Sequence, residues 1–170
     1  RILGHMKVIL AQIKEFKIPT ILTPICMIGE VVMEMIIPML MASIIDKGVN
    51  AGNMDHITRV GVWMIIAAAA GLLFGLLGAV FGARASTGLA KNLRHAEFEH
   101  IQKFSFANID HFGVSGLITR LTTDVTNIQN SFQMALRIGF RAPTSLIVAI
   151  IMAVMISPKL SCIYLIAVVV

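Results

Sequence analysis

Residues 60–83 read VGVWMIIAAAAGLLFGLLGAVFGA, a run of 24 residues without a charged side chain that is closed at its ends by Arg59 and Arg84. A helix of ~20 residues crosses the hydrocarbon core of a bilayer, so this run is long enough to span a membrane. No proline interrupts it. The run therefore predicts a transmembrane helix and decides the class of fold.

The glycines of this run recur at spacings of four, three and four residues, at Gly71, Gly75, Gly78 and Gly82. On a helix they would share one smooth face, and such a face lets another helix approach closely. We expect it to serve helix packing, and it could also let the helix bend or slide.

Further apolar runs stand on either side of the first one. Residues 18–45 carry no charge except Glu30 and Glu34, residues 142–158 carry none, and a last run begins at residue 160. We therefore predict an all-α membrane protein. Its spans are expected at about 18–45, 58–84, 138–157 and 159–170, the last of them truncated.

The composition supports the same class. Of 170 residues, 57% are hydrophobic and 14% are charged, and the mean hydropathy is +0.86. A soluble domain carries roughly 25% charged residues, so the composition argues against a soluble enzyme or a nucleic-acid-binding domain. Cys26 and Cys162 both lie in apolar runs, which gives no support to a disulfide framework or a zinc site.

Lysine and arginine are distributed unevenly between the polar segments. Residues 84–141 contain seven of them and residues 6–17 contain three, whereas residues 46–59 contain two that are balanced by two acids. The positive-inside rule then places the amino terminus and residues 84–141 in the cytoplasm, and residues 46–59 outside. Asp55 is expected to cap the helix that follows this outer loop.

The segment between the second and third spans is too long for an ordinary loop. Its apolar residues recur at helical spacings, and turn-forming residues crowd between positions 108 and 116. We predict a cytoplasmic helical hairpin at about 85–137. Ser157-Pro158-Lys159 predicts a tight outer turn. Residues 1–5 have the look of an expression-tag remnant, which leaves 6–170 as the domain.

Glu30 and Glu34 are the unusual residues of the first span. They lie four residues apart and would share one face of a helix, where an ionised carboxylate in the bilayer costs several kcal/mol. We expect neither to face lipid. Two interpretations stay open: they line a translocation cavity and attract cationic cargo, or they are structural acids that are solvated near the outer leaflet.

Two stretches of the cytoplasmic segment resemble a known family. Residues 93–104 read LRHAEFEHIQKF, and residues 115–125 read SGLITRLTTDV. Together with the expected architecture, they resemble the amino-terminal part of the transmembrane domain of multidrug-type ATP-binding-cassette exporters, over essentially all of residues 6–170. The second stretch looks most like one subunit of a bacterial heterodimeric exporter.

Some positions depart from the family pattern. Ile109 stands where the family usually has Phe, Ser115 where it has Gly, and Gly116 where it has an acid. Arg120 and Asp124 keep the family spacing, and the resemblance implies that they brace the cytoplasmic helix. Without the resemblance they would be an ordinary helix-surface pair that contributes ~0.2–0.5 kcal/mol.

The resemblance implies six long helices per subunit, of which this sequence holds about four. It also implies that the turn between the second and third helices carries a coupling helix, which docks on a nucleotide-binding domain. The residues at this position are Glu97, Phe98, His100, Ile101, Lys103, Phe104 and Ser105.

The partners that the resemblance implies are the lipid bilayer of the plasma membrane, a nucleotide-binding domain, an identical or different second subunit, and an amphipathic cargo of unknown identity. ATP and Mg would belong to the full-length protein, because this chain contains no Gly-x-x-x-x-Gly-Lys-Ser/Thr motif and we expect no cofactor in it. No metal site is expected either, because His95, His100 and His111 lack a ligand spacing.

Two alternatives come from other classes of function. One is a membrane scaffold that recruits a partner through its cytoplasmic hairpin. The other is a non-native oligomer of an isolated transporter fragment, which would form because faces that normally pack on the missing spans are exposed.

Overall fold

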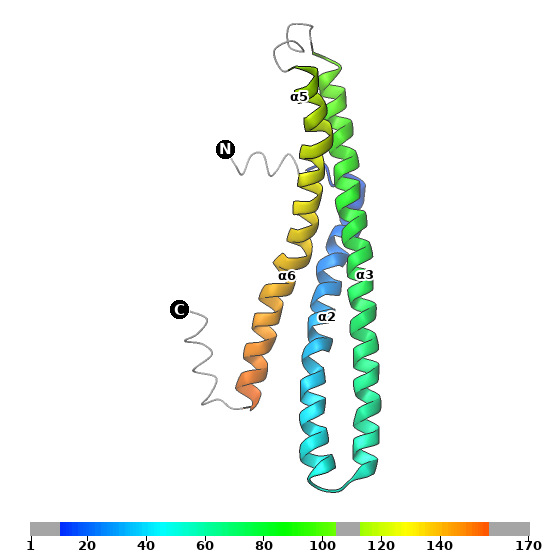
Figure 1. Ribbon diagram of the computed structural model, residues 1–170, viewed down its shortest axis with the longest axis vertical. Helices are drawn as coiled ribbons and strands as arrows, with labels where there is room; N and C mark the ends of the chain where they lie inside the picture. The colour runs from blue at the N-terminus through cyan, green and yellow to red at the C-terminus, as the bar shows by residue number, and fades with distance from the viewer. Residues whose placement is uncertain (1–10, 105–112, 157–170) are drawn as a thin grey trace. The chain divides into compact units, whose positions relative to one another are not determined.

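The computed structural model describes residues 11–104 and 113–156, and every regular element in these ranges is a helix (Figure 1). In chain order the elements are η1 (Lys14–Phe16), α2 (Lys17–Ser43), η2 (Ile44–Val49), α3 (Met54–Ile101), α5 (Val114–Thr119), η3 (Arg120–Asp124) and α6 (Val125–Ile156). η1 is a 3-10 turn, whereas η2 and η3 are π-helical.

Three helical stretches are long and apolar enough to cross a membrane, namely Lys14–Val49, Met54–Ile101 and Val114–Ile156. The predicted all-α membrane fold is thereby confirmed. The expected tag at residues 1–5, the outer turn at residues 157–159 and the span at residues 159–170 lie outside the described residues.

The chain divides into two compact units. Unit 1 comprises Arg1–Thr23 and Ala79–Arg137, and unit 2 comprises Pro24–Gly78 and Ile138–Val170. Each unit contains portions of α2, α3 and α6, because these long helices run through both.

In unit 2, α2 packs closely on the first half of α3 through the glycine face. A Cβ atom placed on Gly78 would overlap Met27, and one placed on Gly71 would stand 3.4 Å from the Cβ of Met33. A Cβ atom on Gly75 would stand 3.3 Å from the carboxylate of Glu30. The absence of side chains at these glycines is therefore what brings the two helices together.

The turn between η2 and α3 is made by residues that adopt or stabilise tight backbone conformations. Gly52 has φ of +64°, which favours glycine, and Asn53 Oδ1 accepts a hydrogen bond of 3.1 Å from the backbone N–H of His56. Asn53 is thus the residue that caps α3. The expectation for Asp55 was wrong, because α3 already begins at Met54 and a cap must precede the first turn.

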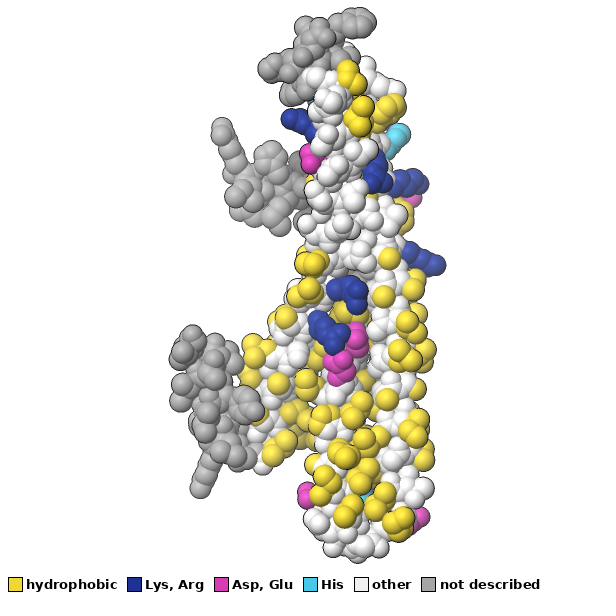
Figure 2. Space-filling view, viewed as in Figure 1, with side chains coloured by type: hydrophobic (Ala, Val, Ile, Leu, Met, Phe, Trp, Pro, Cys, Tyr) yellow, Lys and Arg dark blue, Asp and Glu magenta, His cyan; other side chains and the backbone are white. Residues whose placement is uncertain are grey.

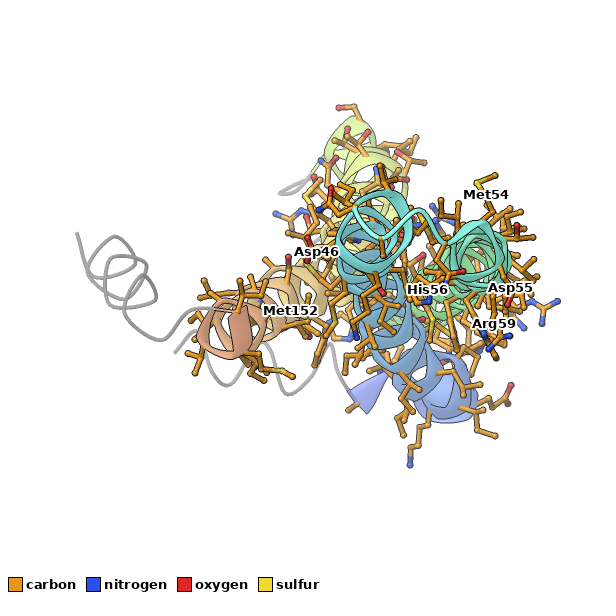
Figure 3. All side chains as sticks on the ribbon, turned by 90° about the horizontal axis from the view of Figure 1, so that it is seen from below. Asp46, Met54, Asp55, His56, Arg59 and Met152 are labelled. Atoms are coloured by element: carbon orange, nitrogen blue, oxygen red, sulfur yellow. The ribbon has the colours of Figure 1, made fainter. Side chains whose placement is uncertain are left out.

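Asp55 instead forms an exposed ion pair of 3.2 Å with Arg59, one turn further along α3. Figure 3 shows both side chains on the side of α3 that is turned away from α2, and His56 on the side toward it. His56 Nε2 lies 3.2 Å from the hydroxyl of Ser43 at the end of α2. This hydrogen bond ties the two helices together beside the turn.

In unit 1, the second half of α3 packs against the helix that returns from the turn, as Figure 1 shows for α5 and the start of α6. The buried centre consists of Ala90, Leu93 and Val125, with Ile128 packed against them. Arg94 also donates a hydrogen bond of 3.2 Å to the hydroxyl of Thr126. These contacts hold the second half of α3 beside the return helix. The two hydrogen-bonded residues are 32 positions apart in the chain.

The turn expected between positions 108 and 116 lies largely among residues that the structure does not describe. α3 ends at Ile101, and the return begins at Gly113, whose φ of +68° favours a residue without a Cβ atom. The return helix also differs from a regular α-helix, because residues Arg120–Asp124 are π-helical.

Candidate functional site

An ionic cluster joins α2 to α6 in unit 2. Arg141 Nη1 donates a hydrogen bond of 2.7 Å to Oε1 of Glu30. Arg141 Nη2 donates to both carboxylate oxygens of Glu34, at 2.7 and 3.0 Å. The two terminal nitrogens of one guanidinium therefore hold two different carboxylates that stand one helical turn apart.

The cluster lies in an otherwise apolar part of the chain, and Figure 2 shows acidic and basic side chains meeting among hydrophobic ones. The side chain of Glu30 is 16% exposed, while those of Arg141 and Glu34 are 40% and 47% exposed. The carboxylate of Glu30 fits against Gly75 on α3, where a Cβ atom would stand in tight contact with it at 3.3 Å. Three helices of unit 2 thus build this cluster.

The charges of the cluster do not cancel. Two carboxylates face one guanidinium, which leaves a formal charge of −1. In addition, Oε2 of Glu30 is buried and has no hydrogen-bond partner among the described residues. The arginine lowers the cost of placing the two acids in an apolar span, and one formal negative charge remains.

Arg141 is the member of this cluster that could not be identified from the sequence. It entered only as one of the seven basic residues of the segment between the second and third spans. The available signal was a basic residue at the edge of an uncharged run, in a chain whose first span holds two acids. Its partners stand 107 and 111 residues away, so spacing alone could not identify them.

The residues expected to couple to a nucleotide-binding domain lie on two sides of the end of α3. Phe98 is half exposed, and the exposed ring of His100 stacks edge to face on the partly buried ring of Phe104 at 5.3 Å. Glu97, His100, Ile101 and Phe104 line a cavity of about 420 Å³ in unit 1. Lys103 precedes Phe104 in the last described turn, and Ser105 lies outside the described residues.

The return helix completes this cavity with Leu117 and Arg120. Glu97 lies 13 positions beyond Arg84, the residue that ends the apolar run of α3. Burial and the nearby charge of Asp124 raise the pKa of the Glu97 carboxyl above its usual range, and the charge of Arg120 partly opposes this shift.

Arg120 and Asp124 therefore act electrostatically on an acid of α3. Both residues belong to the π-helical η3, and their pairing along one turn stays a prediction.

Three apolar helices of membrane-spanning length, with an ion pair between two of them, define a multi-pass helical membrane protein. The family model of the ABC transporter transmembrane region matches residues 20–170, and the chain belongs to this family.

The chain is similar in sequence to several proteins that are named as ABC transporter ATP-binding proteins. The chain is 32% identical over 155 residues to the uncharacterized ABC transporter ATP-binding protein YfiB of Bacillus subtilis, which covers 91% of this chain and 27% of YfiB. It is 35% identical over 118 residues to two further uncharacterized ABC transporter ATP-binding proteins, Mb1304c of Mycobacterium bovis and Rv1273c of Mycobacterium tuberculosis. Each of these alignments covers 69% of this chain and 20% of the relative. The chain therefore spans between a fifth and about a quarter of the length of these relatives.

Proposed function

We propose that this chain forms part of the translocation pathway of an ATP-driven exporter and couples it to a nucleotide-binding domain outside this sequence. The observation that carries the proposal is the length of α3, which has 48 residues and no break. A bilayer requires only ~20 of them, so a single helix extends from the apolar run to a polar end. Such a helix can transmit a displacement between a motor and a membrane cavity.

The partner at the polar end is the nucleotide-binding domain. Phe98 offers an exposed apolar anchor, and charged Glu99 and Lys103 lie beside it in the sequence. The relatives named as ATP-binding proteins support this assignment, because they are about four to five times as long as the region that matches this chain. ATP and Mg bind in that domain, at the plasma membrane, with the amino terminus of this chain in the cytoplasm.

The full-length transporter in proteoliposomes tests the coupling role. We expect Phe98→Ala with Phe104→Ala to reduce transport while ATP hydrolysis continues, or to release the nucleotide-binding domain. The matched control is Leu72→Ala with Leu76→Ala, which removes two exposed side chains of the apolar run on the same helix. Wild-type transport and cargo-stimulated hydrolysis in the first variant would contradict the proposal.

The surplus negative charge of the ionic cluster supports a second part of the proposal, which is that Glu30 and Glu34 favour cationic over neutral cargo. Replacing both with glutamine keeps their volume and removes two charges, so that the cluster changes from −1 to +1. Uptake of a cationic cargo should then fall more than uptake of a neutral cargo of matched size. An equal effect on both cargoes would leave the acids with a structural role.

A further inference from the structure

A second cavity, of about 400 Å³, lies in unit 1 between the start of α2 and the middle of α3. Phe16 and Pro19 form one side of it, and Arg84, Thr87, Gly88 and Lys91 form the other. The ring of Phe16 lies directly on Gly88, where a Cβ atom would overlap it. The floor of this groove is therefore an aromatic ring that only glycine admits.

The basic residues of the groove bracket this floor. Arg84 and Lys91 are seven positions apart, which is two helical turns or ~10 Å along one face of α3. Both are exposed, and neither forms an ion pair with any residue in the described ranges. Among the described residues, no acidic side chain lines the groove, which leaves the two positive charges without a neutralising partner there.

The groove also lies at a particular depth along the helices. Arg84 is the first charged residue after the run of 24 uncharged residues, and Lys17 is the last one before the apolar part of α2. One helical turn back from Arg84, Val80 is exposed on the apolar side, as is Ile21 on α2. Basic residues at such an edge lie at the level of the lipid headgroups, and apolar surface continues from there toward the hydrocarbon core.

We propose that this groove binds an anionic phospholipid of the inner leaflet. Its headgroup phosphate lies between Arg84 and Lys91, over the ring of Phe16, and its acyl chain runs past Arg84 toward Val80. The pair of cations selects a negative headgroup, and the exposed apolar surface at Val80 and Ile21 selects a lipid over a soluble phosphate compound. This site is separate from the ionic cluster and from the coupling surface, so it can be tested independently of transport.

The test uses the purified full-length transporter in vesicles of phosphatidylcholine with one part in five phosphatidylglycerol, and measures the lipids that remain bound after detergent extraction by native mass spectrometry. We expect retained phosphatidylglycerol to exceed its share in the vesicles. Each basic residue beside an anionic headgroup contributes about fivefold, so Arg84→Gln with Lys91→Gln should lower this preference by about 30-fold.

Two matched variants give the result its meaning. Lys47→Gln with Arg59→Gln removes the same charge at the opposite end of the spans and should keep the preference. Arg84→Lys with Lys91→Arg keeps the charge in the groove and should keep it as well. Phe16→Ala should weaken lipid retention although both cations remain.

Three results would overturn the proposal. One is equal retention of phosphatidylglycerol by the wild type and by Arg84→Gln with Lys91→Gln. The second is an equal loss in the Lys47→Gln with Arg59→Gln control, which would indicate a general charge effect. The third is displacement of the lipid by millimolar inorganic phosphate, which would indicate a phosphate site in place of a lipid site.

Discussion

Replacing Arg141 with glutamine tests whether the ionic cluster holds α2 and α6 together in unit 2. The arginine makes three hydrogen bonds of 2.7 to 3.0 Å to Glu30 and Glu34. Glutamine keeps a polar side chain but cannot neutralise a carboxylate. The variant therefore leaves two uncompensated negative charges one helical turn apart.

The expected loss follows from the exposure of the three groups. Removing one partner of a buried ion pair destabilises a protein by about 3–5 kcal/mol, and an exposed pair contributes only ~0.2–1 kcal/mol. Glu30 is 16% exposed, but Arg141 is 40% and Glu34 is 47% exposed, so solvent screens much of the interaction. We expect a loss of ~2 kcal/mol, which lowers Tm by about 4–8 °C in a chain of this size.

Thermal unfolding of the chain in mild detergent, followed by circular dichroism, measures this loss. Arg137→Gln is the matched control, because Arg137 lies on the same helix and makes no ion pair with any described residue. Adding Glu30→Gln and Glu34→Gln to the Arg141→Gln variant should recover much of the stability, since the uncompensated charges disappear. An equal loss in the Arg137→Gln control, or no recovery in the triple variant, would refute this account.

Two further predictions concern unit 1 and the orientation of the chain. Because the folded-state pKa of Glu97 is raised above its ordinary value of 4.5, the stability that this carboxyl contributes is fully present below that value and is lost as pH rises through the raised pKa. Glu97→Gln should therefore flatten the fall in Tm between pH 4 and pH 7, and parallel curves for the variant and the wild type would contradict this. Cysteines introduced at Asn53 and His100 test the topology in intact cells: a membrane-impermeant reagent should label the first and spare the second, and the reverse pattern would overturn the orientation.

Much of the fold could be predicted from the sequence, because a membrane span follows from the hydropathy of consecutive residues. Residues 60–83 carry no charge over more than the thickness of a bilayer, and no other residue has to be known to conclude that they form an apolar helix. The glycine spacing likewise predicts a smooth helix face from one segment alone. Helix ends are less well determined by consecutive residues. The cap was expected at Asp55, but α3 begins at Met54 and its cap is Asn53, two positions earlier.

What a segment contacts depended on the tertiary structure. The sequence identified Glu30 and Glu34 as anomalous, because two acids in an apolar span are costly wherever they stand. Their partner Arg141 comes from another helix, 111 positions beyond Glu30, and the register between α2 and α6 decides whether it reaches them. That register depends on side-chain packing in three dimensions, such as the fit of the Glu30 carboxylate against Gly75.

The same distinction applies to the groove and to the coupling surface. Sequence spacing alone places Arg84 and Lys91 on one face of α3, as it places Phe98 near the end of that helix. Only the folded chain brings Phe16 onto Gly88 to make a groove, and only the fold sets Glu97 beside Arg120 and Asp124. Periodicity and charge therefore determined which helices form and which residues are unusual, because both depend on neighbours in the chain. Packing between helices decided which of these residues meet, because it depends on residues far apart in the chain.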